Sequence, residues 1–211
     1  MTEFTFSPRR HPDLDESTYA QLSEAGTSTL GHLRDHGFIT HLQPIRRPIR
    51  LVGRAVTVRI GEYDAGALGL ALELLEPGDV LVVAQAGAGA RASIGGIVGY
   101  RIAVSGAAGL VVDGAITDHD EIADLGLPVY YRAISPRVTR RIGEQGEASV
   151  DVAIGETVVH TGDIVVGDSD GLVVLSPQEA PEVAADLVAR QAREPGIRAQ
   201  ILQAARDRGV L

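Results

Sequence analysis

The chain has 211 residues, of which 45% are hydrophobic and 22% charged; these are the values of a globular protein with its own core, and they exclude a disordered or fibrous chain. Its formal net charge is -9 at pH 7, without a long run of Lys or Arg, which argues against nucleic-acid binding. Because it has no cysteine, disulfides, thiolate metal sites and cysteine nucleophiles are excluded.

The N-terminus lacks the apolar core of a signal peptide, and no apolar run approaches the length of a membrane span. We therefore expect a cytoplasmic protein that does not enter a membrane. Apolar residues at roughly helical spacing predict a helix over residues 16–36, interrupted at Gly26. Alternating residues over 53–60 predict a half-buried strand, and Asp64 is a candidate N-cap for a helix over residues 65–75.

The middle of the chain continues the alternation of strands and helices. Two almost continuous apolar runs, residues 79–84 and 109–113, have the pattern of strands buried on both faces of a sheet. A loop rich in Gly and Ala over residues 85–94 and a predicted helix over residues 95–105 lie between them. The remaining elements predicted here are a short helix at residues 118–125 and a strand at residues 128–131.

Beyond Ser135-Pro136, short predicted strands are separated by glycine-containing turns, at residues 149–154, 157–160, 163–166 and 171–175. Residues 176–208 are predicted to be helical, with a break at Pro195-Gly196. No repeat, low-complexity tract or linker marks a domain boundary. The sequence therefore predicts one α/β domain over residues 1–211 with a mixed sheet, an N-terminal arm at about residues 1–15 and a C-terminal helical segment at about residues 177–211.

The loop rich in Gly and Ala and the helix after it form the first candidate site. Because the loop lacks bulky side chains, a ligand can approach its backbone closely. The helix that begins near Gly95 and Gly96 points unpaired N–H groups at a phosphate or carboxylate. The loop has no phosphate-binding Lys and does not clearly match the dinucleotide fingerprint. The alternative is that this loop binds no ligand and is only a tight strand–helix connection, whose small residues are needed for packing.

The second candidate site follows the buried strand at residues 109–113, at the strand end where ligands of α/β sheets bind. Residues 118–121 read Asp-His-Asp-Glu, and these carboxylates and the imidazole could hold a hard divalent cation. The same residues fit an ordinary helix start, because Asp118 and Glu121 have the spacing of a capping box. The residues leave both interpretations open.

Other polar residues carry weaker signals. His32 and His36 have the i,i+4 spacing of metal ligands, but no acidic third ligand accompanies them, so we expect both on the surface. Ser93 has no recognisable base and no nucleophile-elbow motif is present, which argues against a serine hydrolase. Residues 168–171, Asp-Ser-Asp-Gly, favour a hairpin turn over a calcium loop.

The order of several short motifs over residues 27–194 resembles the RraA-like family, which includes 4-hydroxy-4-methyl-2-oxoglutarate/4-carboxy-4-hydroxy-2-oxoadipate aldolases. The motifs are GRAVTV at 53–58, PGDVLVV at 77–83, GG at 95–96, GLVVDG at 109–114, LPV at 127–129, SP at 135–136, GDIVV at 162–166 and DGLVV at 170–174. The resemblance implies a swivelling β/β/α fold with flanking helices. It also implies homotrimers or dimers of trimers (homohexamers), with sites near the subunit interfaces.

In the aldolase branch of the family, a divalent cation, usually Mg²⁺ or Mn²⁺, binds the aspartate of an Arg-Asp pair, and this aspartate falls on Asp118. Backbone amides at a helix start receive the substrate carboxylate. By the same resemblance, these amides fall on Gly95, Gly96, Ile97 and Val98.

The chain departs from this pattern at two positions. Thr117 stands where the aldolase branch has the arginine, and a hydroxyl cannot make a bidentate, charge-assisted contact with a carboxylate. Gly96 stands where an acid often follows the helix glycine. Arg91 could reach the same anion, and His119 could add a metal ligand or proton donor; exposed surface positions are the alternative for both. Glu194 is a candidate for the acid that this branch borrows from a neighbouring subunit.

The resemblance therefore implies a divalent-metal-dependent lyase that acts on a small 2-oxo acid, with a non-standard substrate because Thr117 replaces the arginine. Asp118 would hold the cation, and Thr117, Arg91 and His119 are the other candidate catalytic residues. Oxaloacetate decarboxylation uses the same chemistry. The alternative is a catalytically silent RraA-like protein that regulates a partner such as a ribonuclease.

Overall fold

The computed structural model describes residues 14–24, 26–87, 90–143 and 145–210. Its helices are α1 (Glu16–Ser23), α2 (Thr27–Leu30), α3 (Leu68–Leu74), α4 (Gly96–Val104), α5 (His119–Asp124), α6 (Ala180–Gln191) and α7 (Glu194–Asp207). Its strands are β1 (Phe38–Ile39), β2 (Gln43–Pro44), β3 (Leu51–Ile60), β4 (Asp79–Gln85), β5 (Ala92–Ile94), β6 (Gly109–Ile116), β7 (Val129–Ile134), β8 (Glu147–Ala148), β9 (Val152–Ile154), β10 (Thr157–Val159), β11 (Ile164–Asp168) and β12 (Gly171–Leu175).

The described residues form one ten-stranded mixed sheet in the order β1-β12-β11-β3-β4-β6-β7-β2, with β5 beside β6 and β8 beside β3. The central strands β3, β4, β6 and β7 pair in parallel, as β5 does with β6. Antiparallel strands flank them on both sides. The strands β9 and β10 form a separate hairpin. The predicted α/β class with a mixed sheet and flanking helices is confirmed.

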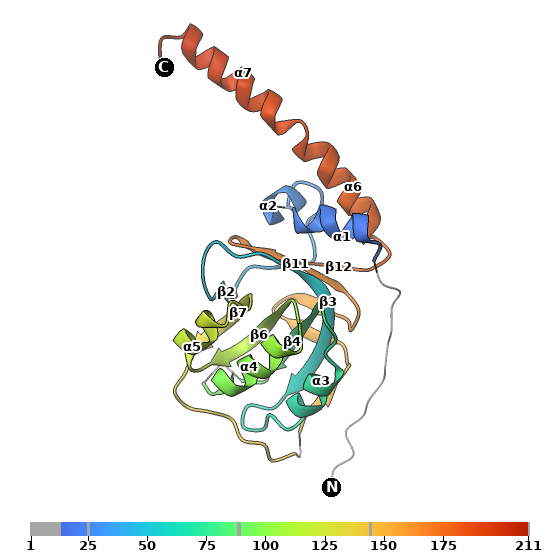
Figure 1. The fold of residues 1–211 in the computed structure, drawn as a ribbon, viewed down its shortest axis with the longest axis vertical. Helices are drawn as coiled ribbons and strands as arrows, with labels where there is room; N and C mark the ends of the chain where they lie inside the picture. Colours follow the sequence, from blue (N-terminus) through green and yellow to red (C-terminus); the bar gives the residue numbers. More distant parts are fainter. Residues whose placement is uncertain (1–13, 25, 88–89, 144, 211) are drawn as a thin grey trace.

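Helices cover the sheet in two groups (Figure 1). The helices α3, α4 and α5 lie along the parallel strands, and the main hydrophobic core is formed there, with β4 and β6 buried throughout or nearly so. The helices α1, α2 and α6 pack on the antiparallel part, where a second apolar cluster contains Leu22, Leu30 and Leu187. From the end of α6, the chain continues into α7, which projects away from the body (Figure 1).

The prediction is confirmed most closely in the middle of the chain. The strands β4 and β6 occupy the two continuous apolar runs, and α4 begins after Gly95 and ends before Ser105. The predicted loop before α4 is wrong at its end, because residues 92–94 form β5 beside β6. The predicted hairpin turn at residues 168–171 is correct: Asp168 pairs with Gly171, and the Asp168 carboxylate accepts from the Asp170 amide.

Three predictions in the first half need correction. The helix expected to reach residue 36 ends at Leu30, because the chain then turns through Gly37, at φ +83°, into β1. The strand expected to be half-buried is central in the sheet, which buries Thr57, and the Thr57 hydroxyl donates to the Val150 carbonyl at 2.6 Å. The Asp64 carboxylate does not cap α3, whose N-cap is Ala67.

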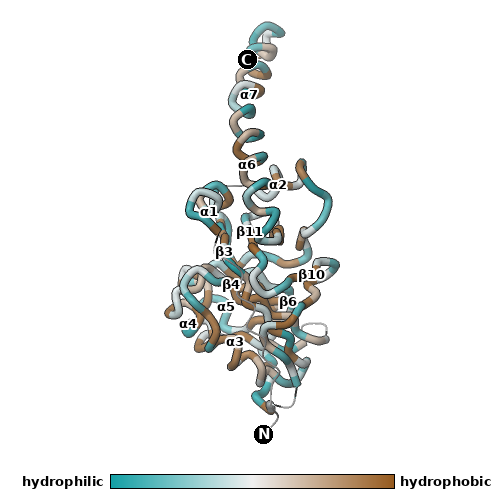
Figure 2. Tube along the Cα trace, turned by 90° about the vertical axis from the view of Figure 1, so that its right-hand side faces the viewer, coloured by the Kyte–Doolittle hydropathy of each residue, from teal (hydrophilic) through white to brown (hydrophobic). Residues whose placement is uncertain are grey.

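The C-terminal helices also differ from the prediction. The predicted break is present but lies at residues 192–193, between α6 and α7, so Pro195 and Gly196 fall in the first turn of α7, where proline is tolerated. The α7 side chains are all at least partly exposed, and Figure 2 shows apolar and polar residues alternating along it. None of the helices in the described ranges combines the length and apolar character of a membrane span.

Candidate functional site

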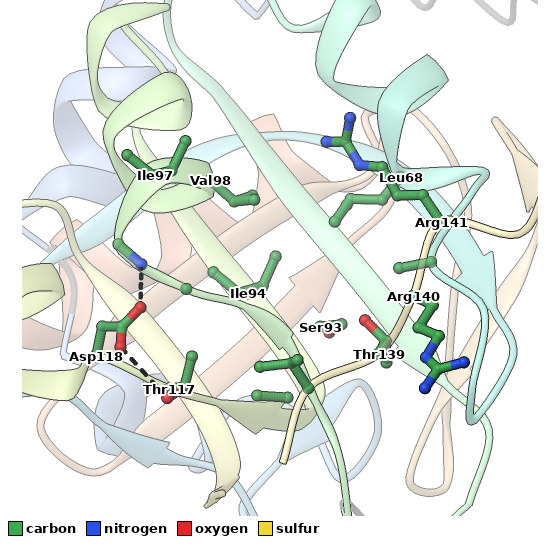
Figure 3. A pocket seen from close by; sticks show the side chains of 15 residues that line it. Leu68, Ser93, Ile94, Ile97, Val98, Thr117, Asp118, Thr139, Arg140 and Arg141 are labelled. Carbon is green, nitrogen blue, oxygen red and sulfur yellow. Dashed lines mark hydrogen bonds between the residues drawn. The ribbon is translucent and has the colours of Figure 1, made fainter. Parts of the chain in front are cut away.

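A pocket of about 260 Å³ opens at the carboxyl end of β6, against the first turn of α4 (Figure 3). Thr117 and Asp118 form one end of it (Figure 3), next to Gly95 and Gly96. The lining residues as a whole are Ala65, Leu68, Ala92, Ser93, Ile94, Gly95, Gly96, Ile97, Val98, Thr117, Asp118, Val138, Thr139, Arg140 and Arg141. The pocket therefore joins both sites predicted from the sequence.

Asp118 has a backbone conformation that separates its side chain from its own helix. It lies in the left-handed region, at φ 52° and ψ 42°, and makes no side-chain capping bond to α5. Its Oδ2 instead accepts the Gly96 amide at 2.9 Å, which places the carboxylate at the start of α4 (Figure 3). Positive φ at a residue other than glycine is uncommon, and such strain gathers at functional sites. The capping-box interpretation of Asp118 and Glu121 is wrong.

The first turn of α4 has amides available to an anion. Its N-cap, Gly95, has no side chain, and the first N–H groups of any helix lack partners within the helix. Asp118 takes the Gly96 amide, and the next two residues, Ile97 and Val98, line the pocket with amides that have no partner within the helix. A Cβ at Gly96 would overlap the Glu121 carboxylate, so α5 places a second acid beside this turn.

The opposite wall of the pocket is residues 138–141, which the sequence analysis does not connect with the site. Ala92 donates to the Arg137 carbonyl at 2.6 Å, and Thr139 donates to the Ala92 carbonyl at 2.9 Å. Arg140 bonds through its backbone to both Tyr63 and Ala65. These bonds hold Thr139, Arg140 and Arg141 along the pocket. The only sequence signal is a pair of adjacent arginines in an acidic chain.

The Asp64 carboxylate anchors this wall. Asp64 is buried, and its two oxygens accept the amides of Gly66, Ile142, Gly143 and Gln145 at 2.8–3.1 Å. One side chain thus ties the turn before α3 to the segment that follows Arg141. Because a carboxylate can accept several hydrogen bonds at once, Asp64 provides an acceptor for four backbone amides that lie outside the helices and strands.

The two residues expected to compensate for Thr117 lie outside the pocket lining. The Arg91 guanidinium lies 5.0 Å from the Tyr63 ring centroid and donates to the Val138 carbonyl at 3.0 Å. His119 contacts Asp120 at 3.1 Å and the edge of the Tyr131 ring. Thr117 does line the pocket, and its hydroxyl lies 3.4 Å from Asp118 Oδ1. The structure brings Asp118, Thr117 and residues 95–98 together, and it does not bring Arg91 or His119 to them.

The remaining candidates are dispersed. Glu194 begins α7 and pairs with Arg198 at 3.1 Å, on the projecting helix and away from the pocket (Figure 1). His32 and His36 are exposed, as expected, and both follow the end of α2, so they do not share a helical face. Across the described ranges, no three His, Asp or Glu side chains come together as a metal site.

Comparison with known proteins agrees with this fold. The RraA-like family model, described as Aldolase/RraA, matches residues 19–174. The chain therefore belongs to the RraA-like family. A protein of Halalkalibacterium halodurans named "Putative 4-hydroxy-4-methyl-2-oxoglutarate aldolase" is 33% identical over 134 residues, which are 64% of this chain and 63% of that relative. The match thus spans less than two thirds of that relative's length.

Two solved structures with a similar fold belong to proteins whose descriptions refer to inhibitors. RraAS2 of Streptomyces coelicolor, described as an unusual member of the RNase ES inhibitor RraA family, superposes with a TM-score of 0.79 at 27% identity, over 90% of this chain and 99% of that one. RraA of Thermus thermophilis, described as an RNA-processing inhibitor, gives a TM-score of 0.65 at 28% identity over 72% and 93% of the two chains. The family thus contains proteins named as aldolases and proteins named as inhibitors.

Proposed function

We propose that this protein is a divalent-metal-dependent carbon–carbon lyase that acts on a small 2-oxo acid. The observation that carries the proposal is the position of the Asp118 carboxylate. Its left-handed backbone turns it away from its own helix and toward the first turn of α4, where helix amides border a pocket. A carboxylate for a cation and amides for an anion thus lie side by side, which is the arrangement that a chelated 2-oxo acid requires.

The donor set at Asp118 fits Mg²⁺ or Mn²⁺. Mg²⁺ is commonly held by one or two carboxylates together with water and substrate oxygens, so a single exposed aspartate is sufficient. Asp118 Oδ1 is the oxygen left for a cation, because Oδ2 accepts the Gly96 amide. When bound, the cation supplies positive charge that stabilises the negative charge developing on the 2-oxo acid as the carbon–carbon bond breaks.

The chain's own groups orient the acid. The amides of Ile97 and Val98, at the positive end of the α4 dipole, receive its carboxylate. The apolar side chains of Leu68, Ile94 and Val98 line the pocket and give it an apolar surface beside its polar groups. Arg140 and Arg141 add positive charge from the opposite wall, in a site where Thr117 carries none.

The test is the decarboxylation of oxaloacetate with and without metal. With 1 mM Mg²⁺ or Mn²⁺, we expect the protein to accelerate pyruvate formation above the rate of the metal ion alone, and excess EDTA to abolish the acceleration, because the charge that stabilises the reacting acid is then removed. Pyruvate is measured with a coupled dehydrogenase. A rate with protein and metal equal to that of the metal alone would contradict the proposal.

A regulatory function is the second candidate, because two structural neighbours are named as inhibitors of RNA processing or of a ribonuclease. A protein that acts only by binding a ribonuclease does not need the Asp118 carboxylate. The decarboxylation assay therefore separates the two candidates. A protein that is inactive in that assay and slows RNA cleavage by an added RNase ES preparation would be assigned to the regulatory function.

We also propose that copies of this chain associate through the outer face of α4. Ile97, Tyr100 and Val104 are 76%, 57% and 65% exposed and lie on one side of this helix, which begins at the pocket. Burial of such an apolar stripe favours association. We expect the native protein to run as an oligomer in size-exclusion chromatography with light scattering, and Tyr100→Glu to shift it to a smaller species. An unchanged mass for Tyr100→Glu, or a monomeric native protein, would contradict this interface.

A further inference from the structure

The Glu121 side chain, from the first turn of α5, ends against the first turn of α4. A Cβ atom at Gly96 would overlap both oxygens of the Glu121 carboxylate, so the carboxylate occupies the space that a side chain at position 96 would fill. Within the described ranges this carboxylate has no hydrogen-bond or ion-pair partner. Glycine at position 96 therefore leaves room for an acidic group that no protein group binds.

Asp118 meets the same turn of α4 through the backbone. Its Oδ2 accepts the Gly96 amide at 2.9 Å, and a Cβ atom at Gly95 would lie 2.8 Å from that oxygen. Two carboxylates from the start of α5 thus converge on Gly96, where Asp118 binds the amide and Glu121 takes the place of a side chain. The Asp118 carboxylate is held by this hydrogen bond, whereas the Glu121 side chain is exposed.

The two carboxylates lack a positive partner within the protein. Like charges beside one residue repel each other unless a cation lies close to both. In the described part of the chain, neither carboxylate forms an ion pair with an arginine or histidine. The helix dipole at the start of α4 offsets only part of the repulsion. A divalent cation bound by carboxylate oxygens would offset more of it, and Mg²⁺ is commonly held by one or two carboxylates together with water.

We infer that Glu121 is the second carboxylate of the cation site and binds the cation held by Asp118, directly or through a bound water. This inference rests on the proposed function, in which Asp118 is the ligand. Glycine at position 96 is then a requirement of the cation site, because a larger side chain would displace the Glu121 carboxylate. Asp118 remains the main ligand, since the Gly96 amide fixes its position.

The experiment measures Mn²⁺ binding to the full chain in the absence of any 2-oxo acid. Titration is followed by electron paramagnetic resonance, in which the signal of free Mn²⁺ falls as the ion binds. We expect the native protein to bind one Mn²⁺ ion. Glu121→Gln should raise the dissociation constant about 10-fold, because a partner of the cation site loses its charge. Asp118→Asn should raise it further.

Gly96→Ala tests the position of the Glu121 carboxylate without changing any charge. The added methyl group displaces the end of a flexible side chain, and the alanine amide can still donate to Asp118. We expect Gly96→Ala to raise the Mn²⁺ dissociation constant by up to about 10-fold. The double variant that combines Gly96→Ala with Glu121→Gln should bind no more weakly than Glu121→Gln alone, because both changes remove the same contact and are therefore not additive.

Asp124→Asn is the matched control for the loss of charge. Asp124 is the last residue of α5, at the end of the helix away from Asp118, and its side chain is exposed. Removing its charge should change the Mn²⁺ dissociation constant by less than about twofold. Glu121→Gln should keep the free energy of unfolding without metal within about 0.5 kcal/mol of the native value, as expected for an exposed group.

The outcomes separate this inference from the proposed function. Mn²⁺ binding that is lost in Asp118→Asn but unchanged in Glu121→Gln would overturn the role of Glu121 and leave the proposed function. Equal weakening in Asp124→Asn and Glu121→Gln would also overturn that role, because the effect would then be one of net charge. Additive losses in the double variant would overturn the position assigned to the carboxylate. A native protein that binds no Mn²⁺ would overturn the proposed function and this inference together.

Discussion

Asp118→Asn is expected to lower the metal-dependent part of oxaloacetate decarboxylation by about 10²–10³-fold, the usual cost of removing one electrostatic contact to a transition state. Asparagine keeps an oxygen that can accept the Gly96 amide, so the start of α4 and the fold should be preserved. What the variant loses is the negative charge that holds the cation. The measurement is the initial rate at saturating Mg²⁺, with Tm recorded alongside it.

Asp120→Asn is the matched control for this change. Asp120 lies two residues further along, in the first turn of α5, its side chain is exposed, and it does not line the pocket. The same loss of one charge should therefore leave the rate within about twofold, as expected for an exposed group outside a site. Equal rates for Asp118→Asn and the native protein would mean that the cation is held elsewhere.

Asp64→Ala is expected to destabilise the protein by about 3–5 kcal/mol, because a buried carboxylate that accepts four backbone amides is removed and those amides lose their partner. For a chain of this size, that loss corresponds to a fall in Tm of about 6–20 °C. Decarboxylation should fall as well, since residues 137–141 lose their anchor beside the pocket. Chemical denaturation measures the loss of free energy of unfolding, and calorimetry measures the fall in Tm.

Asp186→Ala, an exposed aspartate on α6, should change the free energy of unfolding by less than about 0.5 kcal/mol. Asp64→Asn keeps one acceptor oxygen of the two and should lie between the native protein and Asp64→Ala. If Asp64→Ala lowers the free energy of unfolding no more than Asp186→Ala does, the amides of residues 142–145 have found other hydrogen-bond partners. The anchoring role assigned to Asp64 would then be wrong.

Local sequence signals predicted the part of the fold that lies between residues 79 and 116. Continuous apolar runs identify strands buried on both faces, and glycine pairs mark helix starts, so β4, α4 and β6 were predicted with nearly correct ends. The errors concern segments whose structure depends on distant partners. Only the neighbouring β6 and residues 137–139 make residues 92–94 a strand, and only its place at the centre of the sheet buries Thr57.

The sequence predicts the side of the pocket that contains Asp118 but not the opposite wall. Asp118 and residues 95–98 were found because they stand beside a strand end and a helix start, which sequence patterns mark. The opposite wall comes from residues 138–141, about twenty positions further along, and is placed by Asp64, whose spacing suggested a helix cap instead. Arg91 and His119 were candidate site residues because they lie close to the site along the chain. In the structure, however, the Arg91 side chain packs on the Tyr63 ring and the His119 side chain contacts the Tyr131 ring.

The most direct test of the central claim is the exchange of the methyl protons of pyruvate in D₂O, followed by proton NMR, because it reports negative charge on a bound 2-oxo acid without any carbon–carbon cleavage. The account predicts exchange that requires Mg²⁺ or Mn²⁺, stops with EDTA, is lost in Asp118→Asn and persists in Asp120→Asn. Exchange that is absent from the native protein with metal, or that continues unchanged in Asp118→Asn, would contradict it.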